Sequence, residues 1–169
     1  MQTGDATTSP QVKTNVLRLL EGAQLPFRWY EYEVTDGKLD ALSLAAQIGE
    51  PPEQVFKTLV TCGATPRTYF VFVIPGNQEL DLKKAAKAAG EKSVAMLHVS
   101  QLLDLTGYVR GGCSPVGMKK QFPTFYHVSC LGLDTMAVSA GKIGAQAELA
   151  PADLIRLTRG QTADLIVSD

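Results

Sequence analysis

Cysteine is scarce in this sequence, and its arrangement excludes two kinds of protein. The three cysteines are Cys62, Cys113 and Cys130, an odd number without a CxxC pair. Neither a disulfide framework nor a structural zinc site is therefore indicated. Free thiols in a reducing compartment are the simplest explanation.

The motifs of common hydrolases are also missing. The sequence has no HExxH or GxSxG motif, and no cluster of histidines, cysteines and carboxylates with metal-ligand spacing. It contains only two histidines, His98 and His127. We therefore expect chemistry that uses no metal, no other cofactor and no Ser–His–Asp triad.

Two further absences bear on location. The N-terminal residues MQTGDATTSP have neither the basic region nor the apolar core of a signal peptide. No apolar run approaches the roughly 20 residues that a membrane-spanning helix requires. The expectation is a cytoplasmic protein that has no contact with a membrane.

Charge of either sign is not in excess. The formal net charge is −1, whereas proteins that bind long nucleic acids by their phosphates usually carry a strong basic excess. Any contact with nucleic acid must therefore be local or shared with a partner. The 169 residues, 45% of them hydrophobic, suit one globular domain. We predict a disordered tail over residues 1–9 and a single domain over residues 10–169.

Periodicity and capping residues predict a mixture of helices and strands. Helices are predicted from Ser9-Pro10 to Gly22, over residues 42–48, over 82–89 with Asp81 as cap, after a Ser100 cap, and from Pro151. Strands are predicted over residues 27–34, 94–96, 122–128 and 135–141, with 56–62 and 68–74 as a hairpin and 163–167 as a strand or short helix. Because this order is not a regular βαβ alternation, the fold class is α+β.

The stretch TGYVRGGCSPVGMKK, from Thr106 to Lys120, is the most unusual part of the chain. Its four glycines permit positive φ and a close approach of a ligand to the backbone. Such a loop can present N–H groups to a carbonyl oxygen or a phosphate. A tight turn between two elements explains the same residues equally well.

Three other positions could carry chemistry. Lys57 lies in an apolar strand, where partial desolvation would lower its pKa, although a lysine at a strand edge explains the pattern too. Cys113 lies in the glycine loop, but it has no histidine nearby in sequence, so a small buried side chain is favoured over a nucleophile. The turn SAGKIG, residues 139–144, is either a weak phosphate-binding loop or simply the end of a strand.

An ordered set of segments resembles one protein family. The segments are VFKTLV (55–60), ELDLKKAAKAAG (79–90), TGYVRGGCSPVGMKK (106–120), FPTF (122–125), VSAGKIG (138–144) and ELAPADL (148–154). Together they resemble the YbaK/EbsC family of bacterial aminoacyl-tRNA deacylases, which is related to the editing domain of bacterial prolyl-tRNA synthetases. The resemblance implies an α+β fold with a mixed, barrel-like sheet surrounded by helices. It also implies hydrolysis of the ester in mischarged tRNA, with Cys-tRNA(Pro) as the characteristic substrate.

The resemblance also assigns site residues. The central lysine of the family falls on Lys57, and its glycine–proline loop falls on residues 111–115. These matches predict Lys57, Gly111 and Gly112 as catalytic residues. The predicted substrate-binding residues are Tyr32, Ser114, Pro115, Ser139 and Lys142. For a cysteinyl ester, the family chemistry implies that the thiol of the substrate attacks its own carbonyl, so that no protein nucleophile is needed.

Two positions depart from the family pattern. Gln146 stands where an aspartate is expected, which removes a carboxylate from the rim of the site. Cys113 occupies a loop position that is often aliphatic in the family, which weakens its case as a nucleophile.

Other functions stay open at this point. The same site residues could bind the tRNA acceptor end or a small amino-acid-like ligand without hydrolysis, beside prolyl-tRNA synthetase. A third alternative is a cysteine hydrolase that uses Cys113. The sequence leaves open the aminoacyl group, the tRNA selectivity, the oligomeric state, and whether Lys119 and Lys120 contact tRNA.

Overall fold

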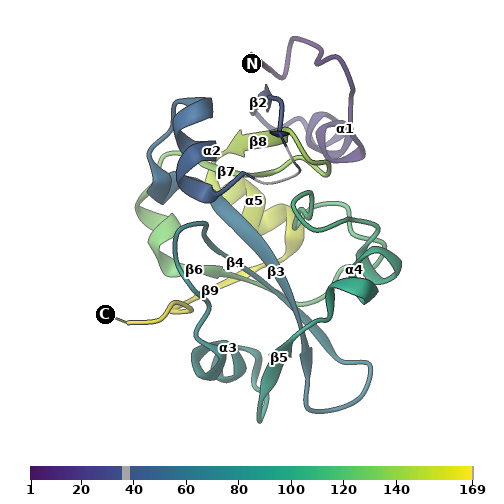
Figure 1. Cartoon of the computed structure of the whole chain (residues 1–169), viewed down its shortest axis with the longest axis vertical. Coiled ribbons are helices and arrows are strands. Elements are labelled where there is room, and N and C mark those ends of the chain that lie inside the picture. Colours follow the sequence, from purple (N-terminus) through teal and green to yellow (C-terminus); the bar gives the residue numbers. More distant parts are fainter. Residues whose placement is uncertain (36–38, 169) are drawn as a thin grey trace.

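The computed structural model describes residues 1–35 and 39–168, and in it strands form two sheets (Figure 1). The strands are β1 (Gln2–Asp5), β2 (Arg28–Glu31), β3 (Phe56–Gly63), β4 (Tyr69–Pro75), β5 (Val94–Met96), β6 (Thr124–His127), β7 (Met136–Ser139), β8 (Ala145–Leu149) and β9 (Gln161–Ala163). One sheet is antiparallel, with the order β1-β2-β8-β7. The other has the order β5-β3-β4-β6-β9 and is mixed, because β6 runs parallel to both β4 and β9.

Within the described residues, five α-helices and two short 3₁₀ helices lie around the sheets (Figure 1). They are α1 (Asn15–Gly22), α2 (Ala41–Ile48), α3 (Leu82–Ala89), α4 (Val99–Thr106), α5 (Pro151–Thr158), η2 (Pro52–Gln54) and η3 (Val128–Gly132). Asp40 and Asp81 cap α2 and α3 by accepting hydrogen bonds from first-turn N–H groups, and Gly49 and Gly90 end these helices with positive φ. In the part of the chain that the structure describes, no helix is long and apolar enough to cross a bilayer.

A parallel bridge between Val55 and Ala137 links the two sheets at the start of β3. The predicted α+β class is confirmed. Instead of the expected barrel-like sheet, the structure has two sheets that are joined at this bridge. The described strands do not close into a barrel. The predicted hairpin is also confirmed, since β3 and β4 pair antiparallel from Phe56 opposite Pro75 to Cys62 opposite Tyr69.

The apolar side chains form three clusters because successive strand residues face opposite sides of a sheet. The central cluster lies between the two sheets and contains Val60, Val73, Val138 and Ala147. A second cluster lies under α3. The third lies under α2 and joins the two sheets across their bridge; its buried members are Tyr30, Ala45, Ile48, Val55 and Ala137.

The prediction of a disordered tail over residues 1–9 does not match the structure, in which residues 2–5 form β1. This strand pairs with β2 at the edge of the antiparallel sheet. The Thr3 hydroxyl donates to the Trp29 carbonyl oxygen at 2.8 Å, and Trp29 Nε1 donates to the Thr8 hydroxyl at 3.2 Å. Backbone pairing and Trp29 therefore order a segment that has almost no apolar side chains of its own.

Several element boundaries also differ from the predictions. The first helix begins at Asn15 with Thr14 as its cap, because the Thr14 hydroxyl accepts the Leu17 N–H. The cap of α4 is His98, whose ring nitrogen accepts the Ser100 N–H, so the predicted Ser100 cap was wrong. Strand β8 was not predicted, and the last strand ends at Ala163 rather than beginning there.

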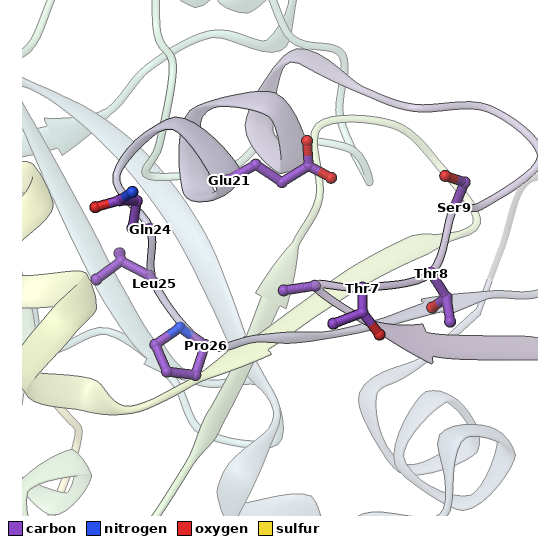
Figure 2. A pocket seen from close by; sticks show the side chains of 8 residues that line it. Thr7, Thr8, Ser9, Glu21, Gln24, Leu25 and Pro26 are labelled. Carbon is purple, nitrogen blue, oxygen red and sulfur yellow. The ribbon is translucent and has the colours of Figure 1, made fainter.

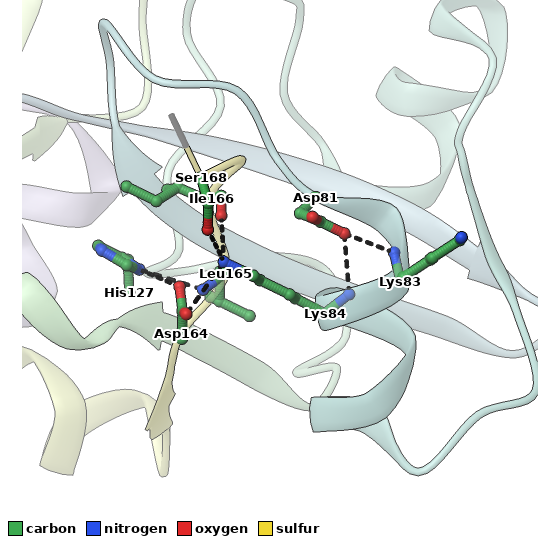
Figure 3. Close-up of polar contacts among 8 residues, drawn as sticks. All are labelled: Asp81, Lys83, Lys84, His127, Asp164, Leu165, Ile166 and Ser168. Carbon is green, nitrogen blue, oxygen red and sulfur yellow. Dashed lines mark hydrogen bonds and ion pairs between the residues drawn. The ribbon is translucent and has the colours of Figure 1, made fainter.

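The C-terminal segment, residues 164–168, forms hydrogen bonds and ion pairs with α3 and β6 (Figure 3). The Lys84 ammonium donates to the Ile166 carbonyl oxygen at 2.8 Å and to the Ser168 hydroxyl at 2.9 Å, and it pairs with Asp164 at 3.0 Å. The Leu165 N–H donates to His127 Nδ1 at 3.1 Å, and the Leu165 side chain is fully buried. Polar contacts thus hold this segment over the second apolar cluster.

His127 must stay neutral in this arrangement, because a protonated Nδ1 cannot accept the Leu165 N–H. Burial lowers the pKa of His127, an effect that the Asp164 carboxylate opposes and the Lys84 ammonium reinforces. A histidine with a lowered folded-state pKa stabilises the fold fully above its unfolded pKa of about 6.5. This contribution is lost as the pH falls from there through the folded-state pKa.

We predict that His127→Asn weakens the pH dependence of stability between about pH 6.5 and 5, since the Asn carbonyl can accept the Leu165 N–H at every pH. Urea unfolding at a series of pH values measures this. The wild-type free energy of unfolding should fall more steeply with decreasing pH than that of the variant. Parallel curves for the two proteins in this window would contradict the role given to His127.

Candidate active site

Two of the predicted site residues, Tyr32 and Ser139, lie beside Gln146 at the antiparallel sheet. Gln146 on β8 is paired with Ser139 on β7, and its Nε2 donates to the Tyr32 hydroxyl at 3.1 Å. The Tyr32 N–H donates to the Gly144 carbonyl oxygen at 2.9 Å, which fixes the chain just beyond β2. Because Val138 and Ala147 point into the central core, the alternating Ser139 and Gln146 point to the opposite, outer face.

Lys57 reaches the same outer face through the bridge between the sheets. Val55 and Ala137 lie side by side in a parallel arrangement, and two residues further along each strand come Lys57 and Ser139. In parallel strands this spacing places both side chains on one face. Burial lowers the pKa of the Lys57 ammonium, and the Glu79 carboxylate partly opposes the effect. The predicted desolvation of this lysine agrees with its half-buried position.

The glycine loop contacts the turn that follows Ser139. A Cβ atom on Gly112 would lie 3.0 Å from the Ile143 nitrogen and 3.0 Å from the Lys142 carbonyl carbon, so a larger residue there would push the loop and the turn apart. Gly111, with φ of +88°, lies against the Ile143 side chain. Lys142 itself forms an ion pair with Glu31 at 3.5 Å. The loop, the 139–144 turn and the end of β2 therefore form one continuous surface.

Inside the loop, the backbone assigns different roles to the predicted residues. The Gly112 N–H donates to the Val109 carbonyl oxygen at 3.0 Å, so it is not free to bind a substrate oxyanion. Among the described residues, the Gly111 N–H has no hydrogen-bond acceptor. Ser114 is fully buried, and its hydroxyl accepts the Val116 N–H at 3.3 Å. Pro115 is buried as well, so both residues shape the loop rather than line its exposed surface.

Cys113 is not built as a nucleophile. It is 7% exposed, and burial raises the pKa of its thiol to about 12. A thiolate, which is the reactive form, is therefore disfavoured at neutral pH. Tyr108 holds the other side of the loop, because its hydroxyl donates to the Val116 carbonyl oxygen.

A network of acidic and hydroxyl groups beside the site was not predicted. The Tyr30 hydroxyl donates to Glu148 Oε1 at 2.6 Å and lies 3.3 Å from Glu50 Oε1, and the Thr135 hydroxyl donates to Glu148 Oε2. Burial raises the pKa of Glu50, and the nearby Glu148 raises it further. The available signal in the sequence was the alternation of Tyr30, in β2, and Tyr32, just beyond it, which places both rings on one face.

Two surface hollows lie away from this arrangement. One, of about 610 Å³, is formed by the N-terminal segment and the end of α1 (Figure 2). The other, of about 240 Å³, lies against the far side of the glycine loop at Val116, Gly117 and Met118. Neither is lined by Lys57, Tyr32 or Ser139. Within the described residues, no three histidine, cysteine or carboxylate side chains are grouped so that they could hold a metal ion.

Known proteins are similar to this chain over most of its length. Residues 36–157 match the aminoacyl-tRNA editing domain family. EbsC of Enterococcus faecalis, named as a candidate Cys-tRNA(Pro)/Cys-tRNA(Cys) deacylase, is 48% identical over 164 residues, which cover 97% of this chain and 99% of that protein.

Two solved structures are similar as well. A candidate trans-editing enzyme for prolyl-tRNA synthetase has a TM-score of 0.77 at 26% identity, covering 92% of this chain and 99% of that one. The hypothetical protein APE2540 has a TM-score of 0.80 at 22% identity, covering 90% and 99%, and supports the fold. The match to most of the chain and the close relative together show that this protein belongs to the aminoacyl-tRNA editing domain family.

Proposed function

We propose that this protein is an aminoacyl-tRNA deacylase that edits in trans, with Cys-tRNA(Pro) as its preferred substrate. The observation that carries the proposal is the shared outer face of Lys57, Ser139 and Gln146, bordered by Tyr32 and the glycine loop. The printed name of EbsC supports the choice of substrate. We propose residues 10–169 as one deacylase domain, to which β1 adds an edge strand.

The proposed roles follow from the chemistry of each group. Lys57, half-buried and positively charged, binds the ester carbonyl oxygen or the terminal-adenosine phosphate. The Gly111 N–H stabilises the oxyanion, while Gly112 keeps the loop against the turn. The hydroxyls of Tyr32 and Ser139 bind the substrate, and Lys142 borders the site from the turn. Ser114 and Pro115 act through the shape of the loop.

A cysteinyl ester supplies its own nucleophile in this proposal. The substrate sulfur forms a bond to the carbonyl carbon, the ester C–O bond breaks, and the thiol proton ends on the released ribose oxygen. The products are a cyclic thiolactone and free tRNA, so this route is a lyase-type cleavage. The protein contributes orientation and charge stabilisation, two effects that each account for large rate factors in enzymes.

A binding module is the second candidate. The net charge of −1 favours a protein that obtains part of its tRNA affinity from a partner, and prolyl-tRNA synthetase is the partner we propose. In this version, the same surface holds the acceptor end without cleaving the ester. The proposed location for either function is the cytoplasm.

We predict that the purified protein releases free tRNA from Cys-tRNA(Pro) faster than from Ala-tRNA(Pro) or Pro-tRNA(Pro). Loss of the radiolabelled aminoacyl ester, measured with and without prolyl-tRNA synthetase, tests this. Tight binding with no loss of any ester above the protein-free rate would favour the binding module instead.

We predict that Lys57→Ala lowers kcat/KM by about 100-fold or more, because a charge directed at the developing oxyanion or phosphate is lost. Lys87→Ala, at an exposed lysine on α3, is the matched control and should retain the wild-type rate. Equal rates for the two variants would remove Lys57 from the mechanism.

We predict that Gly112→Ala lowers kcat/KM by at least about tenfold, because the added methyl group forces the loop away from the Lys142–Ile143 backbone. Gly132→Ala is the control, since a Cβ there meets nothing within 4 Å. Thermal melting of both variants separates a displaced loop from an unfolded chain. Unchanged activity in Gly112→Ala would show that the close contact does not position the site.

A further inference from the structure

Gln146 carries a buried acceptor without a donor. Its side chain is 5% exposed, and among the described residues Oε1 has no hydrogen-bond partner. The other such side-chain atom is the Thr58 hydroxyl, which alternates to the central-core side of β3. Native proteins rarely leave a buried carbonyl oxygen unpaired, so Oε1 of Gln146 calls for a donor from outside the chain.

The polar groups around Gln146 form hydrogen bonds with atoms other than Oε1. Nε2 of Gln146 donates to the Tyr32 hydroxyl at 3.1 Å, so one end of the amide is already paired. The Tyr30 hydroxyl, across the strand pair, donates to Glu148. The Ser139 hydroxyl accepts the Gly141 N–H at 3.1 Å. None of these contacts supplies a hydrogen to Oε1, and Oε1 lies on the face that carries Lys57.

We propose that Oε1 of Gln146 accepts a hydrogen bond from the α-amino group of the aminoacyl ester, and that Gln146 therefore recognises the free amine. This inference rests on the proposed function. In an aminoacyl ester the α-nitrogen is separated from the reacting carbonyl carbon by a single atom. A side chain next to the groups that bind the carbonyl oxygen is therefore close to the α-amine. An amide oxygen can accept a hydrogen bond from either the neutral or the protonated amine. Because the glutamine side chain is neutral, it can do so near Lys57 without forming an ion pair with that lysine.

Binding to an uncleavable substrate tests the inference separately from catalysis. The probe is 3′-amino-3′-deoxyadenosine carrying cysteine through an amide bond, used with a free or an N-acetylated α-amine. Calorimetry should show that the wild-type protein binds the free-amine probe about tenfold more tightly than the acetylated one, as expected for one hydrogen bond to an amine. Gln146→Met should weaken binding of the free-amine probe to the level of the acetylated probe.

One further variant and one further probe keep the test decisive. Gln146→Glu retains an acceptor and should retain the preference for the free amine. If Gln146→Met weakens both probes equally, Gln146 has only a structural role and the proposal fails. A free-amine probe that lacks the ribose 2′-hydroxyl gives the second check. The proposal also fails if Gln146→Met no longer weakens binding of this probe but still weakens binding of the acetylated probe.

The kinetic readout separates the two hypotheses. With Cys-tRNA(Pro), Gln146→Met should raise KM about tenfold and change kcat little, and with N-acetyl-Cys-tRNA(Pro) it should change neither. A wild-type protein that cleaves no ester but discriminates between the probes would contradict the deacylase and retain the amine site. Cleavage that is insensitive to N-acetylation in both proteins would retain the deacylase and overturn the amine site.

Discussion

The parallel bridge between Val55 and Ala137 is the contact on which the candidate site depends. The two sheets share the central core, and among the described residues this bridge is the one backbone pairing between a strand of one sheet and a strand of the other. Lys57 belongs to one sheet and Ser139 to the other, so their common face exists only while the bridge holds. The small third cluster under α2 buries both bridge residues, and packing around them therefore keeps the register of the site.

A second constraint is the close contact between the glycine loop and the 139–144 turn. Glycines in such a loop are readily interpreted as donors of backbone N–H groups, and the structure separates that role from a steric one. Gly112 donates its N–H to the Val109 carbonyl oxygen, and its missing Cβ lets the loop approach Lys142 and Ile143 closely. Gly111 keeps its N–H available among the described residues. Two adjacent glycines therefore serve the site by different physical means.

The sequence predicted the elements whose own residues determine them. The β3–β4 hairpin has β-branched and aromatic side chains throughout, and α2 and α3 have acidic caps and terminal glycines, so local chemistry was sufficient. Strand β1 and strand β8 are different. The residues QTGD and AQAEL have little strand propensity. They form strands because each pairs with one edge of β2 through backbone hydrogen bonds.

The site residues show the same division. Lys57, Tyr32 and Ser139 were predicted from residue type and family resemblance, and the structure places them on or beside one face. The hydrogen bonds inside the loop could not be predicted, since residue types do not tell which backbone N–H is already engaged. For the same reason, Ser114 and Pro115 looked like ligand contacts in the sequence, although they are buried in the loop.

The network beside the site gives a physical reason for glutamine at position 146. Glu148 lies two residues further along β8, on the same face, and it receives hydrogen bonds from Tyr30 and Thr135. Glu50 is close enough that Glu148 raises its pKa. A carboxylate at position 146 would place a third negative charge on this half-buried face, and like charges there disfavour ionisation of one another. A neutral amide keeps an acceptor toward the substrate and leaves the Tyr30–Glu148 pair undisturbed, so this chain can present an oxygen at the site without the electrostatic cost of an acid.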